Sequence, residues 1–392
     1  MISSLLLCIL MSFLIVFFVV MTNNFSIASI IYALFLIFLF TRMTFAERKK
    51  KGSGVVYRRI FQTVFAVGFC IAFISNLYSE RGSMAITTEA MSNAELPFCH
   101  IAISQVFVPF LLTKSIIFPA RISGHYASVA GMLLIWLACT ITVGRGWCSW
   151  ICFYGGWEEG FRHIGKKRRL NLLSRNKEIR EFQFGFFFFI VLASVCELAC
   201  VYCDWFCPFK LVTEYNPATS IPGLIAMVLF IGLFLGLVIV LPMLTKKRTQ
   251  CSSLCPFGAF ASLTDRFSSF RVKIDTEKCI GCLKCATACP FCAIDIQTIQ
   301  EKKGRPEITC AKCGECVGVC PQNAISYEFK FARKGNGSCG KHTPPKTKFG
   351  QGLQNILDPA QLFRFAAFSF AVIISSSFMV KTLTVIWGVF VK

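Results

Sequence analysis

The stretch that decides the fold is a repeat of cysteines near the C-terminal end. The first copy reads Cys279-Ile-Gly-Cys-Leu-Lys-Cys-Ala-Thr-Ala-Cys-Pro-Phe-Cys-Ala-Ile294, and the second reads Cys310-Ala-Lys-Cys-Gly-Glu-Cys-Val-Gly-Val-Cys-Pro-Gln-Asn-Ala-Ile325. Both copies have the spacing C-x2-C-x2-C-x3-C-P and both end in Ala-Ile. This spacing is typical of cysteines that bind [4Fe-4S] clusters. The repeat therefore predicts two clusters and one-electron chemistry.

The two copies resemble the halves of a two-cluster bacterial ferredoxin, in which the fourth cysteine of each run binds the cluster of the other half. The resemblance gives one ligand set of Cys279, Cys282, Cys285 and Cys320, and a second set of Cys310, Cys313, Cys316 and Cys289. Zinc is disfavoured because its sites use pairs of C-x2-C without a third cysteine two residues on. A disulfide framework is disfavoured on the reducing side of a membrane. Cys292 is extra, and we expect it to be a packed thiol that binds no metal.

The rest of the chain is too apolar for a soluble protein. It is 55% hydrophobic and 16% charged, with a mean hydropathy of +0.62. A membrane-spanning helix needs about 20 apolar residues. We expect spans over Ile2–Met21, Phe25–Met43, Ile60–Tyr78, Tyr126–Val143, Phe182–Cys203, Ile221–Leu244 and Phe363–Val380. The predicted fold class is an α-helical multi-span membrane protein with a small α+β two-[4Fe-4S] ferredoxin domain.

Two apolar segments need separate interpretation. The first span has no basic region before it and no small-residue cleavage site, so we expect a retained anchor rather than a removed signal peptide. Ile101–Phe118 is interrupted by Ser104, Gln105, Pro109 and Lys114. We expect it to be a re-entrant or outer-surface segment, because a full crossing would place the basic loop after Arg162 outside, against the positive-inside rule.

Loop charges predict the orientation. Basic residues cluster in 42–59, 162–180 and 246–248, whereas Ser79–His100 has one arginine and three glutamates. Lys and Arg are concentrated in cytoplasmic loops. We therefore expect a multi-pass protein of the bacterial cytoplasmic (inner) membrane with its ferredoxin domain in the cytoplasm. The net charge of +21 then reflects orientation and attraction to anionic lipid. Nucleic acid binding is disfavoured, because the basic runs lack interleaved aromatic residues.

Two further cysteine pairs lie at the predicted cytoplasmic ends of spans. Cys148 and Cys152 follow one span, and Cys251 and Cys255 follow another. Each C-x3-C pair places two thiols on one turn of chain. Together the four supply the ligands of a third cluster; the alternative is two unrelated pairs of buried cysteines.

A last group contains Cys196, Cys200, Cys203 and Cys207, at the predicted outer end of the Phe182 span. Four thiols within twelve residues are enough for a fourth cluster, provided that the helix ends by about Cys203, because a straight helix spreads them too far apart. The alternatives are a packed helix face and a disulfide.

These motifs together resemble the membrane-bound ferredoxins of the NapH and NosR type, whose relatives include CcoG and the YccM group. Cys203–Pro208 resembles the first membrane motif of that family, Cys251–Phe260 resembles the second, and Gly144–Cys152 resembles a further copy of the first. Phe153 stands where the motif has proline, and three C-x3-C motifs are present where two are usual. The resemblance implies an iron–sulfur electron-transport protein.

The predicted organisation has four parts: N-terminal spans with an outer loop and a re-entrant segment (1–125), spans with the C-x3-C motifs (126–262), the two-cluster ferredoxin domain (263–335), and a linker with a C-terminal span (336–392). The expected function is transfer of single electrons between a cytoplasmic donor, such as a ferredoxin or flavodoxin, and a membrane or extracytoplasmic redox partner. The alternative is an assembly or metal-reducing factor for a respiratory metalloenzyme.

Other functions find less support in the sequence. Quinone is a candidate partner near Lys114, Arg121 and His125. With four histidines and no pair within a span, a bis-histidine haem is disfavoured. No Walker loop, Rossmann fingerprint or Ser–His–Asp set appears. Whether the chain is an enzyme in its own right therefore stays open, with electron carrier or oxidoreductase subunit as the expectation.

Overall fold

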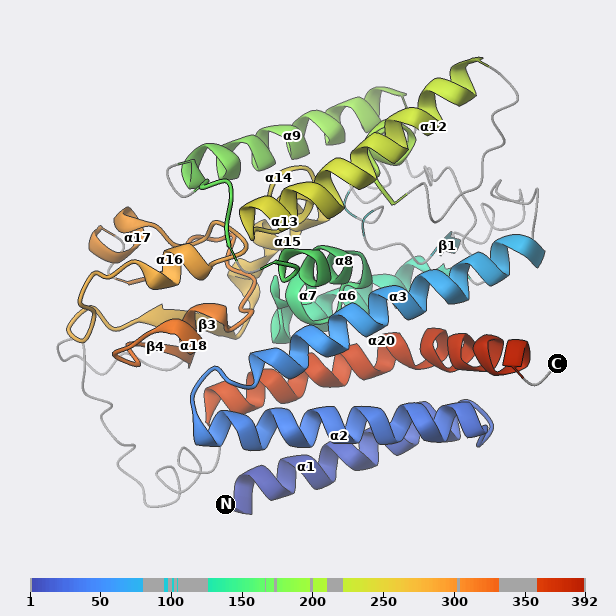
Figure 1. The fold of residues 1–392 in the computed structure, drawn as a ribbon, viewed down its shortest axis with the longest axis horizontal. Coiled ribbons are helices and arrows are strands. Elements are labelled where there is room, and N and C mark those ends of the chain that lie inside the picture. Colours follow the sequence, from blue (N-terminus) through green and yellow to red (C-terminus); the bar gives the residue numbers. More distant parts are fainter. Residues whose placement is uncertain are drawn as a thin grey trace.

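The structure is a computed structural model that describes residues 2–79, 95–97, 101, 104, 126–165, 167–172, 175–197, 200–209, 221–301, 304–330 and 358–390. Long helices run side by side, and a small module with a two-stranded sheet lies at one end of them (Figure 1). In the described part, six helices are long and apolar enough to cross a membrane. The predicted fold class, a multi-span helical membrane protein with a small α+β ferredoxin domain, is confirmed.

One group of helices joins the two ends of the chain. It consists of α1 (Ile2–Ile15) continued by η1 (Val16–Met21), α2 (Ile27–Lys49), α3 (Val55–Ser79) and α20 (Pro359–Phe390). The C-terminal helix α20 lies between α2 and α3 in Figure 1 and packs against both. The buried hydroxyl groups of Tyr32 and Ser375 are 2.7 Å apart, and Arg364 pairs with Glu47 at 2.8 Å. Such polar contacts between spans replace hydrogen bonds that lipid cannot provide.

The second group lies above the first in Figure 1. It consists of α9 (Asn176–Glu197) and a long helix made of α12 (Ile221–Leu233), η2 (Phe234–Val240) and α13 (Leu241–Thr245). The span Gly223–Thr245 has a mean hydropathy of 3.2, yet only 11% of its most apolar window is buried in protein. An apolar surface of this kind is stable when it faces lipid tails rather than water.

Short helices fill the space between the two groups and carry the C-x3-C motifs. They are α6 (Val129–Thr142), α7 (Gly146–Trp150), α8 (Phe153–Arg162), α10 (Val201–Trp205), α14 (Thr249–Ser253), α15 (Pro256–Thr264) and the 3-10 turn η3 (Asp265–Phe267). Helix α8 packs closely on α3 at Gly156, where a Cβ atom would lie 2.2 Å from the carbonyl oxygen of Gln62. Glycine at this position allows the two backbones to approach, and this approach brings α3 to the cysteines of α7 and α8.

One predicted span differs from the structure. Over Tyr126–Val143 the chain forms a short strand, β2 (Tyr126–Ser128), and then α6, which has only 14 residues. Strand β2 pairs antiparallel with β1 (Glu95–Pro97). Helix α6 is therefore shorter than a full span. Apart from Ile101 and Ser104, the predicted re-entrant segment Ile101–Phe118 lies outside the described residues.

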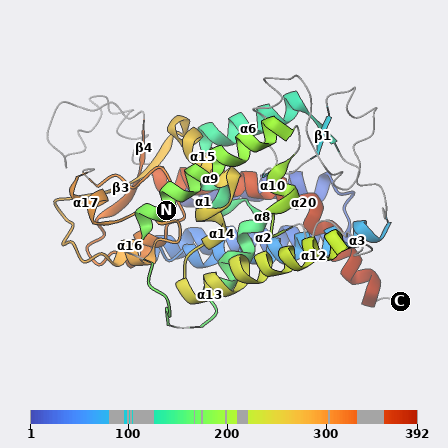
Figure 2. The ribbon, with the colours of Figure 1, turned by 90° about the horizontal axis from the view of Figure 1, so that it is seen from above.

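The ferredoxin module contains the predicted internal symmetry. Its elements are β3 (Phe270–Ile274), which pairs antiparallel with β4 (Ile325–Phe329), and the helices α16 (Lys284–Ala288), α17 (Ile296–Gln300) and α18 (Glu315–Val319). Gly281 and Lys312, which occupy equivalent positions in the two copies, have φ angles of 69° and 51°. Leu283 and Gly314 form a second equivalent pair, at 54° and 82°. The same left-handed turns therefore recur in both halves. Seen from above in Figure 2, the module again lies at one end of the helices.

The module is fixed to the membrane part by buried charge. Glu315, the first residue of α18, is 5% exposed and accepts hydrogen bonds from Arg58 and Arg59 of α3 and from Arg162 of α8. The Arg162–Glu315 pair is 2.6 Å long. Burial alone would raise the pKa of Glu315, but Arg162, Arg59 and Arg58 outweigh it and hold the pKa below its usual value. Removing one member of a buried ion pair costs about 3–5 kcal/mol, because the partner charges stay buried and uncompensated.

Glu315→Gln should therefore loosen the docking of the module without preventing its folding. A loss of about 3 kcal/mol raises the population of the undocked state roughly 100-fold. Amide hydrogen exchange in the purified protein should accelerate at residues 147–151 and 311–316. Glu178→Gln is the matched control, because Glu178 is 72% exposed in its pair with Arg175 and exposed pairs contribute little. Equal protection in both variants would contradict the proposed role of Glu315.

Candidate iron–sulfur centres and the path between them

The structure brings together the four cysteines that are predicted to hold the first cluster. One cavity of the module is lined by Cys279, Cys282 and Cys285 together with Cys320 of the other copy. Burial raises the pKa of Cys285 to about 11, and the charges of Cys279 and Cys282 contribute to the shift. The three cysteines of the first run and the last cysteine of the second run therefore surround one space.

The second site contains the complementary set. Burial raises the pKa of Cys316, and the neighbouring thiolates of Cys313, Cys310 and Cys289 raise it further. Burial raises the pKa of Cys310 to about 11 and that of Cys313 to about 12, and the charge of Cys289 contributes to both shifts. Cys289 has thus crossed from the first run into the second site.

The two halves of the module differ in exposure although their sequences are equivalent. Cys282 in the first half is exposed, whereas its equivalent Cys313 is only 7% exposed. Lys284 in the first half is exposed, and its equivalent, Glu315, is the buried residue that docks the module. The first site therefore faces away from the membrane part, and the second site faces toward it.

The four cysteines predicted for a third site converge in the membrane part. Burial raises the pKa of Cys152, and the charges of Cys148 and Cys255 raise it further. The pKa of Cys251 is raised by burial and also by Glu158, Cys255 and Cys152. All four are at most 9% exposed. The structure therefore favours one shared site over two unrelated pairs.

Two glutamines that the sequence analysis missed hold these cysteine turns in place. Gln62 of α3 donates from Nε2 to the carbonyl oxygens of Cys148 and Cys152, each at 3.1 Å. Gln183 of α9 donates to the carbonyl oxygen of Cys251 at 3.0 Å. Each C-x3-C turn is thus held by an amide from a different span. A glutamine within an apolar span was the available signal, because buried amides need partners.

Helix starts orient the second cysteine of each pair. Cys152 is the N-cap of α8, and its Sγ accepts a hydrogen bond from the amide of Gly155 at 3.3 Å. Cys255 is the N-cap of α15, which has Pro256 at its first position. Proline and phenylalanine are both compatible with this position. Phe153 stands where the motif has proline, and its ring stacks on that of Phe69 of α3 with the ring centroids 3.7 Å apart.

Direct hydrogen bonds connect the third site to the second. Between Cys148 and Cys152, Ser149 donates to the carbonyl oxygen of Ala311 at 2.6 Å, and Trp150 Nε1 donates to that of Lys312 at 3.2 Å. Ala311 and Lys312 lie between the cluster-binding residues Cys310 and Cys313 in the sequence.

A second connection uses the chain before Cys251. Lys247 Nζ donates to the carbonyl oxygen of Cys289 at 2.8 Å, and the amide of Arg248 donates to that of Pro290 at 3.0 Å. The two sites therefore share a continuous, hydrogen-bonded interface.

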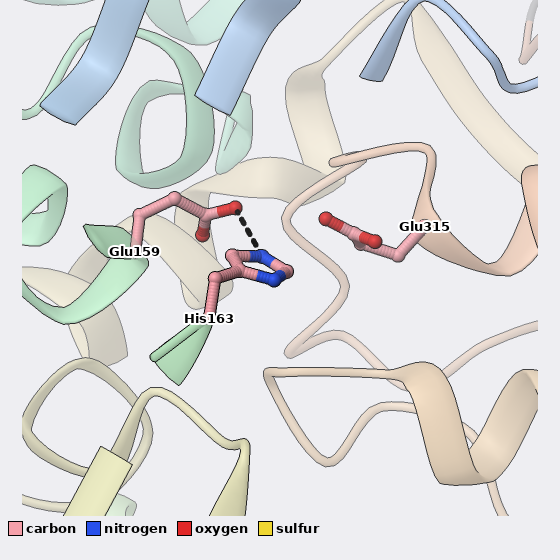
Figure 3. Close-up of side chains that lie close together, drawn as sticks. All are labelled: Glu159, His163 and Glu315. Carbon is pink, nitrogen blue, oxygen red and sulfur yellow. Dashed lines mark ion pairs between the residues drawn. The ribbon is translucent and has the colours of Figure 1, made fainter. Parts of the chain in front are cut away.

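A group of two carboxylates and one imidazole lies at this interface (Figure 3). Glu159 comes from α8, His163 directly follows that helix, and Glu315 comes from α18; their ligand atoms all lie within 4.8 Å of one another. Both carboxylates already form ion pairs with arginines. The guanidinium groups concerned belong to Arg58, Arg59, Arg162 and Arg248. Burial lowers the pKa of His163. Carboxylates that are paired in this way are poor metal ligands, so the group is an ion-pair network.

The third site fits a cluster rather than a single metal ion. Four thiolates around one zinc ion would place their sulfur atoms about 3.8 Å apart. Within the described part of the chain, no three cysteine sulfur atoms lie within 4.8 Å of one another. The site is buried, has four sulfur donors, and carries more guanidinium than carboxylate charge around it. These features suit a [4Fe-4S] cubane, which keeps a net negative charge when four thiolates bind it.

The group from Cys196 to Cys207 extends from the end of α9 through α10. Helix α9 ends at Glu197, and α10 lies back against its middle, where Tyr202 and Phe206 contact Phe186 at ring distances of 6.4 and 5.3 Å. From Cys200 on, the chain therefore packs along α9 rather than continuing it, and the position of the group relative to the outer face stays a prediction. The cause is packing: α10 buries its aromatic side chains against α9, which sequence periodicity does not reveal.

Within this group, the thiols of Cys200 and Cys203 are 3.0 Å apart, and Cys196 is exposed on α9. The phenol of Tyr202 accepts a hydrogen bond from Gln250, the residue before Cys251. Burial raises the pKa of Tyr202, and the charges of Cys207, Cys255 and Cys203 raise it further. The group is therefore adjacent to the third site. A fourth cluster stays a prediction.

Comparisons with known proteins agree with this geometry. Residues 278–325 match a 4Fe-4S dicluster domain, and residues 125–171, 183–215 and 223–275 match a 4Fe-4S binding domain. The second match includes all three C-x3-C segments of the membrane part. The chain is thus a protein with ferredoxin-type iron–sulfur domains on membrane helices.

Several relatives share this combination or part of it. An uncharacterized protein of Methanocaldococcus jannaschii is 27% identical over 53% of this chain and 80% of its own length. The putative electron transport protein YccM of Escherichia coli is 26% identical over 51% of this chain and 56% of its own length. A ferredoxin of Pyrobaculum islandicum is 34% identical over 20% of this chain and 87% of its own length. No solved structure matches this chain. The chain belongs to the membrane-type polyferredoxins and is an iron–sulfur electron-transfer protein.

Two cysteine variants test the third site against the ferredoxin sites. Cys255→Ala removes one of four converging sulfur donors, so it should abolish the signal of the third cluster and leave the two ferredoxin clusters. Cys292→Ala is the matched control: Cys292 is buried within the module but belongs to neither predicted ligand set, and its loss should leave every cluster in place. Electron paramagnetic resonance of the dithionite-reduced protein measures both. A full set of signals in Cys255→Ala would refute the shared site.

Proposed function

We propose that this protein carries single electrons from a cytoplasmic donor, through the two ferredoxin clusters and a third cluster, to a membrane or extracytoplasmic partner. The observation that carries the proposal is the order of the three sites. The first is exposed at Cys282, the second is buried against the membrane part, and the third shares hydrogen bonds with the second through Ser149 and Trp150.

The proposed ligand sets follow the geometry of each site. The first cluster is held by Cys279, Cys282, Cys285 and Cys320, and the second by Cys310, Cys313, Cys316 and Cys289. The third is held by Cys148, Cys152, Cys251 and Cys255. When bound, each cubane supplies a one-electron couple. The chain's own residues exclude water from the second and third sites and hold the cysteine turns in fixed positions.

The proposed orientation places the module in the cytoplasm. Its support is that basic residues from three separate segments meet at the module: Arg58 and Arg59 at the start of α3, Arg162 at the end of α8, and Lys247 with Arg248 before α14 all contact it. Lys and Arg concentrate in cytoplasmic loops. A bacterial cytoplasmic membrane with the module on its inner side is therefore the proposed location. The residues considered for quinone, Lys114, Arg121 and His125, lie outside the described residues.

Iron and acid-labile sulfide counting on the anaerobically purified protein tests the number of clusters. We expect about 12 irons per chain, since each of three cubanes contains four. About 16 irons would add the predicted fourth cluster of Cys196, Cys200, Cys203 and Cys207. About 8 irons would refute the third cluster and leave a simple membrane-anchored ferredoxin.

The surface over the first site is suited to an acidic donor protein. Lys284 and Cys282 are exposed there, and Ile280 beside them is 63% exposed. An apolar residue next to a lysine and a cluster ligand resembles the centre and rim of a transient interface.

Reversing this charge should slow entry of electrons. Lys284→Glu should lower the rate of reduction by an acidic flavodoxin several-fold at low salt, because complementary charge mainly affects the association rate. The difference should vanish at high ionic strength. Lys50→Glu, at an exposed lysine that caps the C-terminal end of α2, is the control. Stopped-flow absorbance measures the rate, and equal rates for wild type and Lys284→Glu at low salt would place donor docking elsewhere.

A further inference from the structure

Arg145 is a buried arginine whose guanidinium contacts a thiol and an aromatic ring but, among the described residues, donates to no carboxylate or carbonyl oxygen. It lies in the turn between α6 and α7 and is 0% exposed. Among the described residues, no hydrogen-bond partner reaches its Nε, Nη1 or Nη2 atoms. The comparably buried Arg248, by contrast, donates to Glu159 at 2.8 Å and to the carbonyl oxygen of Cys148 at 2.6 Å. A buried, unpaired guanidinium costs several kcal/mol, so its position implies a negatively charged partner.

The groups around Arg145 identify where this partner lies. Burial raises the pKa of Cys148, whereas the charges of Arg145 and Arg248 lower it, so the guanidinium is beside a thiol of the third site. Its Cζ also lies 5.6 Å from the ring centre of Phe291, two residues after Cys289 of the second site. Arg145 therefore lies between the third site and the second. Among the described residues, no carboxylate or carbonyl oxygen of either site accepts a hydrogen bond from its guanidinium.

The backbone, rather than the side chain, fixes Arg145 in this place. Its amide donates to Oδ1 of Asp265 at 2.8 Å. The preceding Gly144 has a φ of +59°, and a Cβ atom there would lie 2.1 Å from the same Oδ1 atom. A turn that only glycine can form thus delivers the arginine to the third site. Because the backbone provides the anchor, the guanidinium keeps all of its donors for another group.

We propose that Arg145 donates these N–H groups to the sulfur atoms of the third cluster and raises its reduction potential. This inference rests on the third cluster of the proposed function. In the step concerned, one electron leaves the reduced second cluster and enters the oxidised third cluster, and no bond is made or broken. Arg145 stabilises the reduced state, because that state carries one more negative charge. Hydrogen bonds to sulfur and local charge are the means by which a protein adjusts cluster potentials.

The consequence is that, at equilibrium, electrons are found at the third site rather than in the ferredoxin module, because the third cluster has the raised reduction potential. A guanidinium presents several N–H groups in a planar fork, whereas an ammonium group acts as a point charge. Arginine is therefore better suited than lysine to several sulfur acceptors at once. The inference concerns the potential of one cluster and leaves the number of clusters unchanged.

Redox titration of the full-length protein, followed by electron paramagnetic resonance, tests the inference. Arg145→Gln removes the charge, so the ratio of reduced to oxidised third cluster at a fixed potential should fall at least about tenfold, which is about 59 mV for one electron. Arg145→Lys keeps the charge and loses the fork, so its potential should lie between those of Arg145→Gln and wild type. Arg175→Gln, at a side chain that is 70% exposed, is the control and should match wild type.

The outcomes separate this inference from the proposed function. Two clusters in the wild type would overturn the third site and, with it, the role of Arg145. Three clusters in the wild type with an unshifted third potential in Arg145→Gln would overturn the inference alone. If Arg145→Gln keeps the ferredoxin signals and assembles no third cluster, Arg145→Lys decides: a potential below wild type supports the inference, and a potential equal to wild type overturns it.

Discussion

The most deeply buried ion pairs that dock the ferredoxin module centre on one carboxylate, that of Glu315, which is surrounded by arginines from α3 and α8. The hydrogen bonds that join the second and third sites through Ser149, Trp150 and Lys247 lie on the same interface as these ion pairs. The equivalent position in the other half of the module is Lys284, which arginines would repel. A pseudo-symmetric module could otherwise present either half to the membrane part. The difference in sign between two equivalent residues therefore favours docking of the second site, rather than the first, against the membrane part.

Much of the site could be predicted because its information is local. The spacing of Cys279, Cys282 and Cys285 is sufficient to define a cluster motif, and the left-handed turns at Gly281 and Lys312 repeat as the sequences do. The C-x3-C pairs were also identifiable, because each occupies a single turn. Most span positions followed from hydropathy, but Tyr126–Val143 forms a strand and a helix of only 14 residues.

What could not be predicted depends on contacts between distant segments. Gln62 and Gln183 act on cysteine turns that lie 86 and 68 residues away in sequence. Helix α10 lies against the middle of α9 because its aromatic side chains pack on Phe186, and no periodic pattern encodes that choice. In the sequence, Arg145 is one more basic residue after an apolar segment. Only the structure shows that its guanidinium is buried.

The buried position of the second site also constrains how the protein matures. The docking ion pairs join residues 257 positions apart in the sequence, Arg58 and Glu315, so they form only after most of the chain has been synthesised. Once they form, Cys313 and Cys316 are no longer accessible from solvent, whereas Cys282 still is. Solvent therefore reaches the first site at Cys282, whereas the equivalent Cys313 of the second site is covered once the module has docked.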